Sequence, residues 1–129
     1  MLKGDEKMKN KIITNKAPKP VANYSQGIKF GDMLFVSGQG PLDVKTGIIP
    51  EGIEKQTEQV LLNIKSILEE AKYSINDVVK VNVYLSDLKN FENFNTVYKK
   101  YFKEIFPVRT TIGCQLNNIL VEIDVIACK

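Results

Sequence analysis

Two charged residues in the second half of the chain are of types that can take part in binding or acid–base chemistry. The first, Arg109, follows Phe106-Pro107-Val108 at the start of an expected strand. Its planar guanidinium group suits two-point capture of a carboxylate or a phosphate. On the local sequence alone, an exposed arginine at a strand end is the simpler interpretation.

The second charged residue, Glu122, lies between Val121 and Ile123 in the middle of an expected strand. A charge there is costly unless it is paired, solvated or functional, and a structural ion pair at an interface is an equally good explanation. A third candidate, Ser37-Gly38-Gln39-Gly40, contains glycines that let the backbone approach a ligand closely. A plain turn is the simpler explanation of this segment, because its spacing matches neither a P-loop nor a dinucleotide fingerprint.

The chain contains no histidine, which restricts the chemistry available to it. Neither a Ser-His or Cys-His nucleophile pair nor an imidazole metal ligand can form. Acid–base chemistry must use carboxylates, lysine, tyrosine, backbone groups or water, and we expect no metal site. Cys114 and Cys128 can form one pair at most, so a reducing compartment is the expected environment.

The composition is that of one globular domain: 43% of the 129 residues are hydrophobic and 26% are charged. Lysines near the N-terminus supply much of the net charge of +3. Such a tail can contact nucleic acid, but terminal segments of this kind are more often solvated and poorly ordered. We therefore predict a flexible basic tail over residues 1–11 and one domain over residues 12–129. No segment resembles a transmembrane helix or a secretory signal, so we expect a cytoplasmic protein without a membrane partner.

Two segments have the apolar spacing of amphipathic helices. From Ile53 to Ala71 the apolar residues recur at intervals of three and four, and Gly52 precedes the segment. The second segment runs from about Phe91 to Ile105, with Asn90 as a plausible N-cap and Pro107 beyond its end. Its stripe is mainly aromatic, which we interpret as core.

Alternation of apolar and polar residues indicates strands. Val79, Val81, Val83 and Leu85 are predicted to share one face, and a short apolar run spans 33–36. The segments 110–116 and 119–125 also alternate. The resulting order, β-β-α-β-α-β-β, predicts an α+β fold with both helices on one face of a mixed sheet.

The last two strands are predicted to form a hairpin through a two-residue turn at Asn117-Asn118, because asparagine tolerates positive φ. This register pairs Gly113 with Glu122. Arg109, Thr111, Gly113, Gln115, Glu122 and Asp124 then share one polar face, while Ile112, Cys114, Val121, Ile123 and Val125 lie beneath the helices. A polar face on a central sheet must meet water or another subunit.

Many short motifs resemble those of the Rid/YjgF family, which also includes the endoribonuclease L-PSP proteins, in both order and near-spacing. They are Ala17-Pro18, Tyr24-Ser25-Gln26, Ser37-Gly38-Gln39, Pro41-Leu42-Asp43, Thr46-Gly47, Gln56-Thr57, Asn63, 77–80, 94–98, Pro107-Val108-Arg109 and 122–127. The resemblance covers the chain from about residue 12 to its end. It implies a chorismate-mutase-like fold, a homotrimer and ligand clefts between subunits.

The resemblance also implies an activity: hydrolysis of the 2-imino acids 2-iminobutanoate and 2-iminopropanoate to 2-keto acids and ammonia, without metal or organic cofactor. Carried over by position, Arg109 resembles the arginine that holds the substrate carboxylate, and Glu122 resembles the acid that activates water. Substrate-binding positions are Tyr24, Ser37, Gly38, Asn95, Arg109 and Thr111. The partners expected are a 2-imino or 2-keto acid and two further copies of the chain, with no nucleic acid.

The chain departs from the family pattern in three places. Ala22-Asn23 replaces a frequent Gly-Pro, Thr111 stands where some members carry a cysteine, and the last hairpin is shorter and lacks its Leu-Pro turn. Two other functions stay open: a translation-inhibiting endoribonuclease, and a non-catalytic trimer that binds small molecules or acts like a chaperone. The absence of histidine and of an evident basic aromatic surface argues against the ribonuclease.

Overall fold

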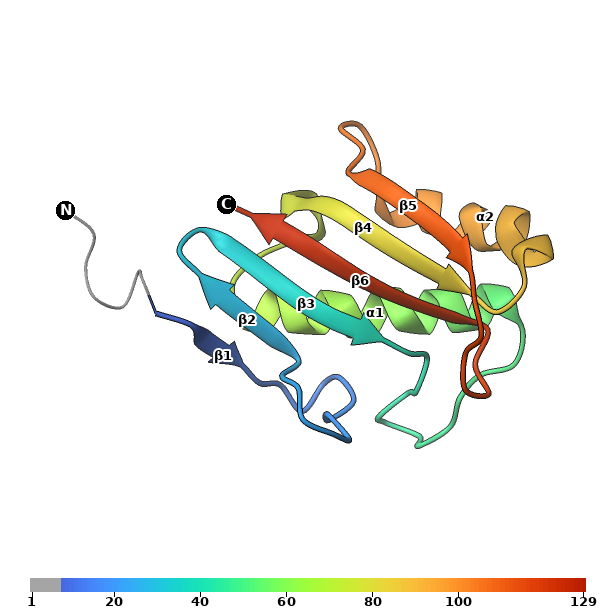
Figure 1. The fold of residues 1–129 in the computed structure, drawn as a ribbon, viewed down its shortest axis with the longest axis horizontal. Helices are drawn as coiled ribbons and strands as arrows, with labels where there is room; N and C mark the ends of the chain where they lie inside the picture. The colour runs from blue at the N-terminus through green and yellow to red at the C-terminus, as the bar shows by residue number, and fades with distance from the viewer. Residues whose placement is uncertain (1–7) are drawn as a thin grey trace.

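A six-stranded mixed sheet forms the frame of the structure, a computed structural model that describes residues 8–129 (Figure 1). The strands lie in the order β1-β2-β3-β6-β4-β5, so the last strand in sequence, β6, occupies the middle of the sheet. The strands are β1 (Asn10–Ile12), β2 (Gly27–Phe30), β3 (Met33–Gln39), β4 (Val78–Leu85), β5 (Val108–Gly113) and β6 (Val121–Cys128). Only β4 and β5 pair in parallel; the other neighbours are antiparallel.

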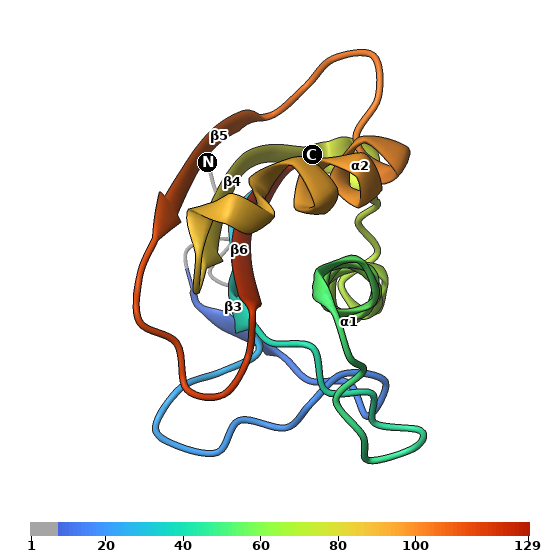
Figure 2. The ribbon, with the colours of Figure 1, turned by 90° about the vertical axis from the view of Figure 1, so that its right-hand side faces the viewer.

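Both helices, α1 (Ile53–Glu70) and α2 (Phe91–Tyr101), lie on the same side of this sheet, as Figure 2 shows. The apolar stripe of α1 is buried against the sheet, with Val60, Leu61, Ile64, Ile67 and Leu68 fully enclosed. Short 3-10 turns, η2 (Ile75–Asp77) and η3 (Leu88–Asn90), precede β4 and α2. The predicted fold class is confirmed, with one additional edge strand.

The edge strand β1 begins at Asn10, so the sheet includes residues 10 and 11, which the sequence had assigned to the tail. The rest of the predicted tail includes residues 1–7, which lie outside the described residues. No helix in the described part of the chain is long and apolar enough to cross a membrane.

The second helix ends earlier than predicted, and its stripe does not extend to Ile105. Phe102 leaves the helical conformation (φ −110°, ψ 110°) and packs its ring on Tyr98, with the ring centroids 4.5 Å apart. Glu104 then adopts a left-handed conformation (φ 61°), and Ile105 is 94% exposed. Burial of the Phe102 ring against the core takes the place of a last helical turn.

A bulge in β4 makes the predicted position of Val79 wrong. The register of β4 against β6 shifts between Val78 and Lys80, and Val79 is exposed while Val78 is buried. A bulge adds one residue to a strand and reverses the facing of the residues before it. The remaining prediction for this strand is confirmed, because Val81, Val83 and Leu85 are fully buried beneath the helices.

The predicted hairpin between the last two strands is wrong. Asn118 does have positive φ (62°), but the turn connects strands that are not neighbours, since β4 lies between β5 and β6. The β4-α2-β5 crossover places β5 parallel to β4 at the edge of the sheet. Arg109 pairs with Val81 and Thr111 with Val83, so both face the helices.

Glu122 pairs with Tyr84 and therefore points to the open face of the sheet, away from the helices. Arg109 and Glu122 thus lie on opposite faces, where the hairpin register had placed them on one. The same reasoning corrects Ile112, which pairs with Tyr84, is 44% exposed and lies on the open face.

A buried glutamine fixes the loop before β2. The side-chain oxygen Oε1 of Gln26 accepts a hydrogen bond from the Thr14 backbone amide at 2.8 Å. The side-chain nitrogen Nε2 donates to the backbone carbonyl oxygens of Thr14, Ala17 and Pro18. The Gln26 side chain is only 2% exposed. One side chain therefore satisfies four backbone groups that no strand reaches.

We expect Gln26→Leu to lower the free energy of unfolding by roughly 2 to 4 kcal/mol, because it leaves several buried backbone groups without partners. Exposed Gln115 provides the control, and Gln115→Leu should change stability little. Denaturant unfolding at a fixed protein concentration measures both variants. Equal stability of the two variants would contradict the assigned role.

Candidate functional site

Arg109 rests on a platform of aromatic rings that α2 presents to the edge strand β5. Its guanidinium carbon lies 4.6 Å from the ring centre of Tyr98, 5.5 Å from Phe91 and 5.9 Å from Phe94. Asn95, on the same helix, accepts a hydrogen bond from Arg109 Nη1 at 2.8 Å. A planar cation over aromatic faces is stabilised by their quadrupoles, and the amide fixes its orientation.

This arginine has a fixed position but no acidic partner within residues 8–129. Among residues 8–129, the one ion pair joins Lys89 to Asp87 on the surface. Arg109 is half-buried, so its charge is partly removed from water without a counter-charge. It borders a cavity of about 510 Å³ that is lined by Asn95, Tyr98, Lys99, Phe102, Phe106, Pro107 and Arg109. An anion with a small apolar body would satisfy both the guanidinium and these walls.

Burial of the Tyr98 phenol raises its pKa, an effect that the neighbouring Arg109 charge partly offsets. Tyr98 therefore stays a neutral phenol at physiological pH. The platform contributes ring faces to Arg109, and no competing negative charge.

Glu122 lies on the other face of the sheet, beside a bulge in β3. The register of β3 against β6 shifts between Val36 and Gln39, so Ser37 and Gly38 form the irregular segment. A side chain at position 38 would overlap the Glu122 carboxylate, with the Oε2 oxygen as the nearest atom. A residue with a Cβ at position 38 would have to displace the Glu122 carboxylate, so the glycine keeps that carboxylate in its present position.

Burial raises the pKa of Glu122, and the negative charge of Asp124 raises it further. No hydrogen bond to the Glu122 carboxylate occurs within the described part of the chain. A half-buried carboxylate with free oxygens and raised proton affinity can accept a proton from a water molecule.

The predicted site residues form two groups rather than one. Arg109, Asn95 and Thr111 lie on the helix-covered side of β5, whereas Glu122, Ser37 and Gly38 lie around the β3 bulge and the open face. Ser37 is fixed by two hydrogen bonds that it donates to the backbone carbonyl oxygen of Gln26. The Ser37 backbone amide donates at 2.9 Å and the Ser37 hydroxyl at 3.1 Å.

Tyr24 and Thr111, the remaining predicted site residues, lie in different surroundings. Tyr24 is 47% exposed in the loop before β2, and it borders a cavity of about 320 Å³ together with Lys11, Lys19 and Gln26. The Thr111 hydroxyl is buried and has no hydrogen-bond partner within residues 8–129. Thr111 is two residues from Arg109 on the same face of β5, but it does not line the cavity beside Arg109.

Sequence reasoning missed the aromatic platform as part of the site. The spacing of Phe91, Phe94 and Tyr98 indicated a core stripe, and two of these residues are indeed core. Asn95 lies next to them on the helix and interrupts the apolar pattern, which is the signal that could have indicated a second role. The contact with Arg109 follows only from the parallel pairing of β5.

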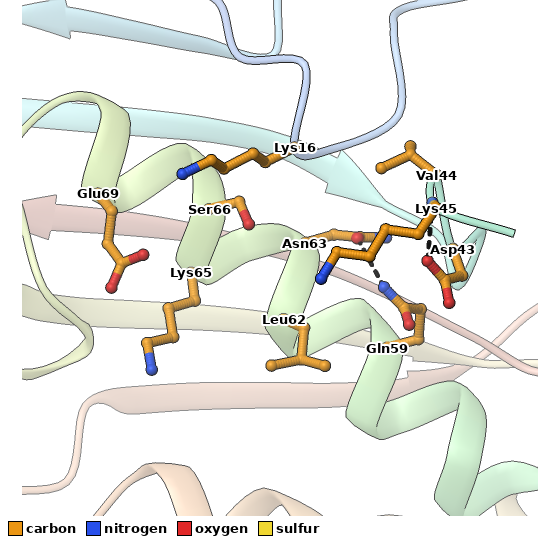
Figure 3. Close-up of a pocket in the computed structure, with 10 residues that line it drawn as sticks. All are labelled: Lys16, Asp43, Val44, Lys45, Gln59, Leu62, Asn63, Lys65, Ser66 and Glu69. Carbon is orange, nitrogen blue, oxygen red and sulfur yellow. Dashed lines mark hydrogen bonds between the residues drawn. The ribbon is translucent and has the colours of Figure 1, made fainter.

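A separate cavity of about 330 Å³ lies on the outer side of α1, between this helix and the turn at Asp43 (Figure 3). Asn63 stabilises its wall by donating to the carbonyl oxygens of Gly40 and Leu42. Lys16, Lys45, Lys65 and Glu69 supply charges of both signs at its rim. None of the predicted site residues lines it. No group of three or more metal-binding side chains occurs in the described part of the chain.

The fold and the two groups of residues define a small α+β protein with an oriented, half-buried arginine beside α2. Residues 14–129 match the family described as Endoribonuclease L-PSP. A RutC family protein of Pyrococcus horikoshii is 51% identical over 95% of this chain and 99% of its own length. The chain therefore belongs to the Endoribonuclease L-PSP family, the Rid/YjgF family that its motifs resemble.

Solved structures agree with this assignment. The crystal structure of RidA from an Antarctic Psychrobacter has a TM-score of 0.89 and 40% sequence identity, and covers 93% of this chain and 99% of that one. The E. coli TdcF structure with bound serine also has a TM-score of 0.89, at 34% identity, over 93% and 98% of the two chains.

We expect Gly38→Ala to remove the function of Glu122 while the fold persists, because the new methyl group must displace the carboxylate. Gly40→Ala is the matched control, since its Cβ would meet only the flexible end of the Ile119 side chain at 3.3 Å. Hydrolysis of 2-imino acids, the activity that the family resemblance implies, and thermal unfolding are measured for both variants. Full activity of Gly38→Ala would contradict the assigned packing.

Proposed function

We propose that this protein hydrolyses 2-imino acids, such as 2-iminobutanoate and 2-iminopropanoate, to 2-keto acids and ammonia. The observation that carries the proposal is Arg109, an oriented and half-buried guanidinium group without an acidic partner in residues 8–129. A carboxylate is the natural ligand for its two-pronged geometry. The serine bound to E. coli TdcF, a relative of similar structure, also carries a carboxylate on its α-carbon.

The proposed reaction needs little from the protein beyond positioning. Water adds to the imine carbon as the C=N electrons move to nitrogen, and Glu122 accepts a proton from that water. The proton passes to the nitrogen to give a carbinolamine. Its hydroxyl proton is then transferred to the amine nitrogen, again by way of Glu122, as C=O forms and the C–N bond breaks to release ammonia. One imino acid and one water give one keto acid and one ammonia, without a redox step or cofactor.

The opposite facing of Arg109 and Glu122 supports a site assembled from two subunits. Within one chain the two side chains point to opposite faces of the sheet, so a neighbouring subunit would bring them together more easily. We propose a homotrimer in which the Arg109 side of one subunit meets the Glu122 side of its neighbour. The open face carries apolar residues that assembly would cover, including Phe30 (46% exposed), Phe35 (42% exposed) and Ile126.

The environment proposed for this reaction is the cytoplasm. Both cysteines are free thiols, which agrees with a reducing compartment. Imines of this type would form where dehydratases act on serine and threonine, and their removal would protect pyridoxal-phosphate enzymes.

Arg109→Ala should abolish hydrolysis, and Arg109→Lys should lower kcat/KM by about 10- to 100-fold, since lysine loses the planar two-point grip. Imines are generated by an amino-acid oxidase or a dehydratase, and their loss is followed as semicarbazone or keto-acid formation. Lys99→Ala, which alters the same cavity at its rim, is the control.

Near-wild-type turnover by Arg109→Lys across several imines would contradict the carboxylate clamp. The same preparations are incubated with RNA. Cleavage of RNA without imine turnover would favour the ribonuclease, and binding of keto acids without turnover would favour a non-catalytic trimer.

Mixed trimers test the two-subunit site. Light scattering should first give a mass of three times the 14.6 kDa of the chain. Arg109→Ala and Glu122→Gln trimers, each inactive, are then dissociated, mixed equally and reassembled. If every site takes one residue from each of two neighbours, about a quarter of sites should regain both. No recovery in verified mixed trimers would mean that both residues act within one chain.

A further inference from the structure

We propose that Asp124 is a positioning residue for Glu122: its carboxylate, clamped by Tyr84 and Asn82, holds a negative charge beside Glu122 and makes Glu122 the stronger base toward water. The inference rests on the proposed function, because it concerns the residue that would activate water. Asp124 itself would not touch the substrate.

The clamp is defined by two hydrogen bonds, one to each oxygen of Asp124. Asn82 Nδ2 donates to Oδ1 at 2.9 Å, and the Tyr84 hydroxyl donates to Oδ2 at 2.8 Å. Asn82 is the direct cross-strand partner of Asp124, and Tyr84 is the partner of Glu122. Both donors therefore come from β4 and hold the Asp124 carboxylate in one orientation.

Glu122 and Asp124 lie two residues apart on the same face of β6. Neighbouring residues of one strand face are about 7 Å apart along the strand, close enough for their charges to interact across a half-buried surface. Each carboxylate is half-buried, but their contacts differ. Asp124 has two donors, whereas the described residues supply no hydrogen bond to Glu122.

Among the described residues of the same chain, the other groups around Glu122 do not supply a compensating positive charge. The β3 bulge contributes Ser37 and Gly38, which do not titrate. On β4, Lys80 faces the same side but pairs with Ile126, four residues along β6 from Glu122, or roughly 13 Å. Cys114 follows β5 and lies close enough to contribute to the raised pKa of Tyr84.

The pKa values agree with this geometry. Burial raises the pKa of Glu122, and Asp124 is the second cause of the increase. The hydrogen bond to Asp124 raises the pKa of Tyr84 to about 12, so the phenol keeps its proton and remains a donor throughout the neutral range. The clamp is then present whenever Glu122 is required to accept a proton.

A base of higher pKa removes a proton from water more effectively, provided that it is ionised at the working pH. Removing the charge at position 124 should lower the pKa of Glu122. The Glu122 carboxyl group should then titrate at lower pH. The acid limb of kcat/KM should move in the same direction.

The test is a titration of the Glu122 carboxyl group by 13C NMR in the assembled protein, with Glu122→Gln used to assign its signal. Asp124→Asn should move the Glu122 midpoint to lower pH. The variant is nearly isosteric, and the Asn82 amide can turn over to accept from it. Glu70→Gln, an exposed change of equal charge on α1, should leave the midpoint in place.

A double variant separates charge from packing. Asn82→Asp combined with Asp124→Asn moves the carboxylate from β6 to β4 but keeps it on the same face and within the same hydrogen bonds. The midpoint should return part of the way toward its original pH. A merely structural role for Asp124 predicts no change in the midpoint in either variant, and that result would overturn the proposal.

The titration also separates the proposed imine hydrolysis from the proposed role of Asp124. A wild-type protein without imine turnover would refute the proposed function, while the Glu122 midpoint would still decide whether Asp124 controls this carboxylate. Imine turnover with an acid limb that Asp124→Asn does not move would refute the positioning role alone.

Discussion

The location of β6 between β3 and β4 is the constraint on which the rest of the structure depends. Both of its edges are paired, so neither can shift register without breaking hydrogen bonds on two sides. Its alternation is strict: Val121, Ile123, Val125 and Ala127 are buried beneath the helices, and the residues between them face the open side. The facing of Glu122 and Asp124 is therefore a consequence of core formation. Neither side chain can turn inward without disrupting the core.

The position of Arg109 on the helix-covered face of the sheet follows from the connection between β4 and β5. A parallel β4-β5 pair requires a crossover, and α2 provides it. This connection places the edge strand directly against the helix that precedes it in sequence, so that Arg109 meets Asn95 and Tyr98. An arginine at a sheet edge would ordinarily extend into water. Here the crossover supplies aromatic faces and an amide, which together hold the guanidinium group with its remaining donors available.

The sequence predicted most of the elements, but not their arrangement in the sheet. Apolar periodicity located α1 almost to the residue and most of β4, because burial imposes that periodicity directly. The hairpin failed because Asn117-Asn118 has the chemistry of a tight turn whether or not the strands around it are neighbours. Local sequence cannot distinguish the two cases, since pairing of β6 with β3 and β4 depends on contacts distant along the chain. The facing of Arg109 relative to Glu122 depended entirely on that pairing.

The two charges also explain why a single chain looks incomplete. Arg109 is a half-buried cation without a counter-ion among the described residues, and Glu122 is a half-buried carboxylate whose burial disfavours its charged form. Each arrangement costs folding free energy in the isolated chain. Within the described part of the chain, Arg109 lacks an acidic partner on its face of the sheet, and Glu122 lacks a neighbouring positive charge on the other face. Apposition of two subunits would give a carboxylate-bearing ligand both an arginine to bind it and a base to direct water at it. The folding free energy lost by burying these two charges in one chain would then be offset at a site formed between two subunits.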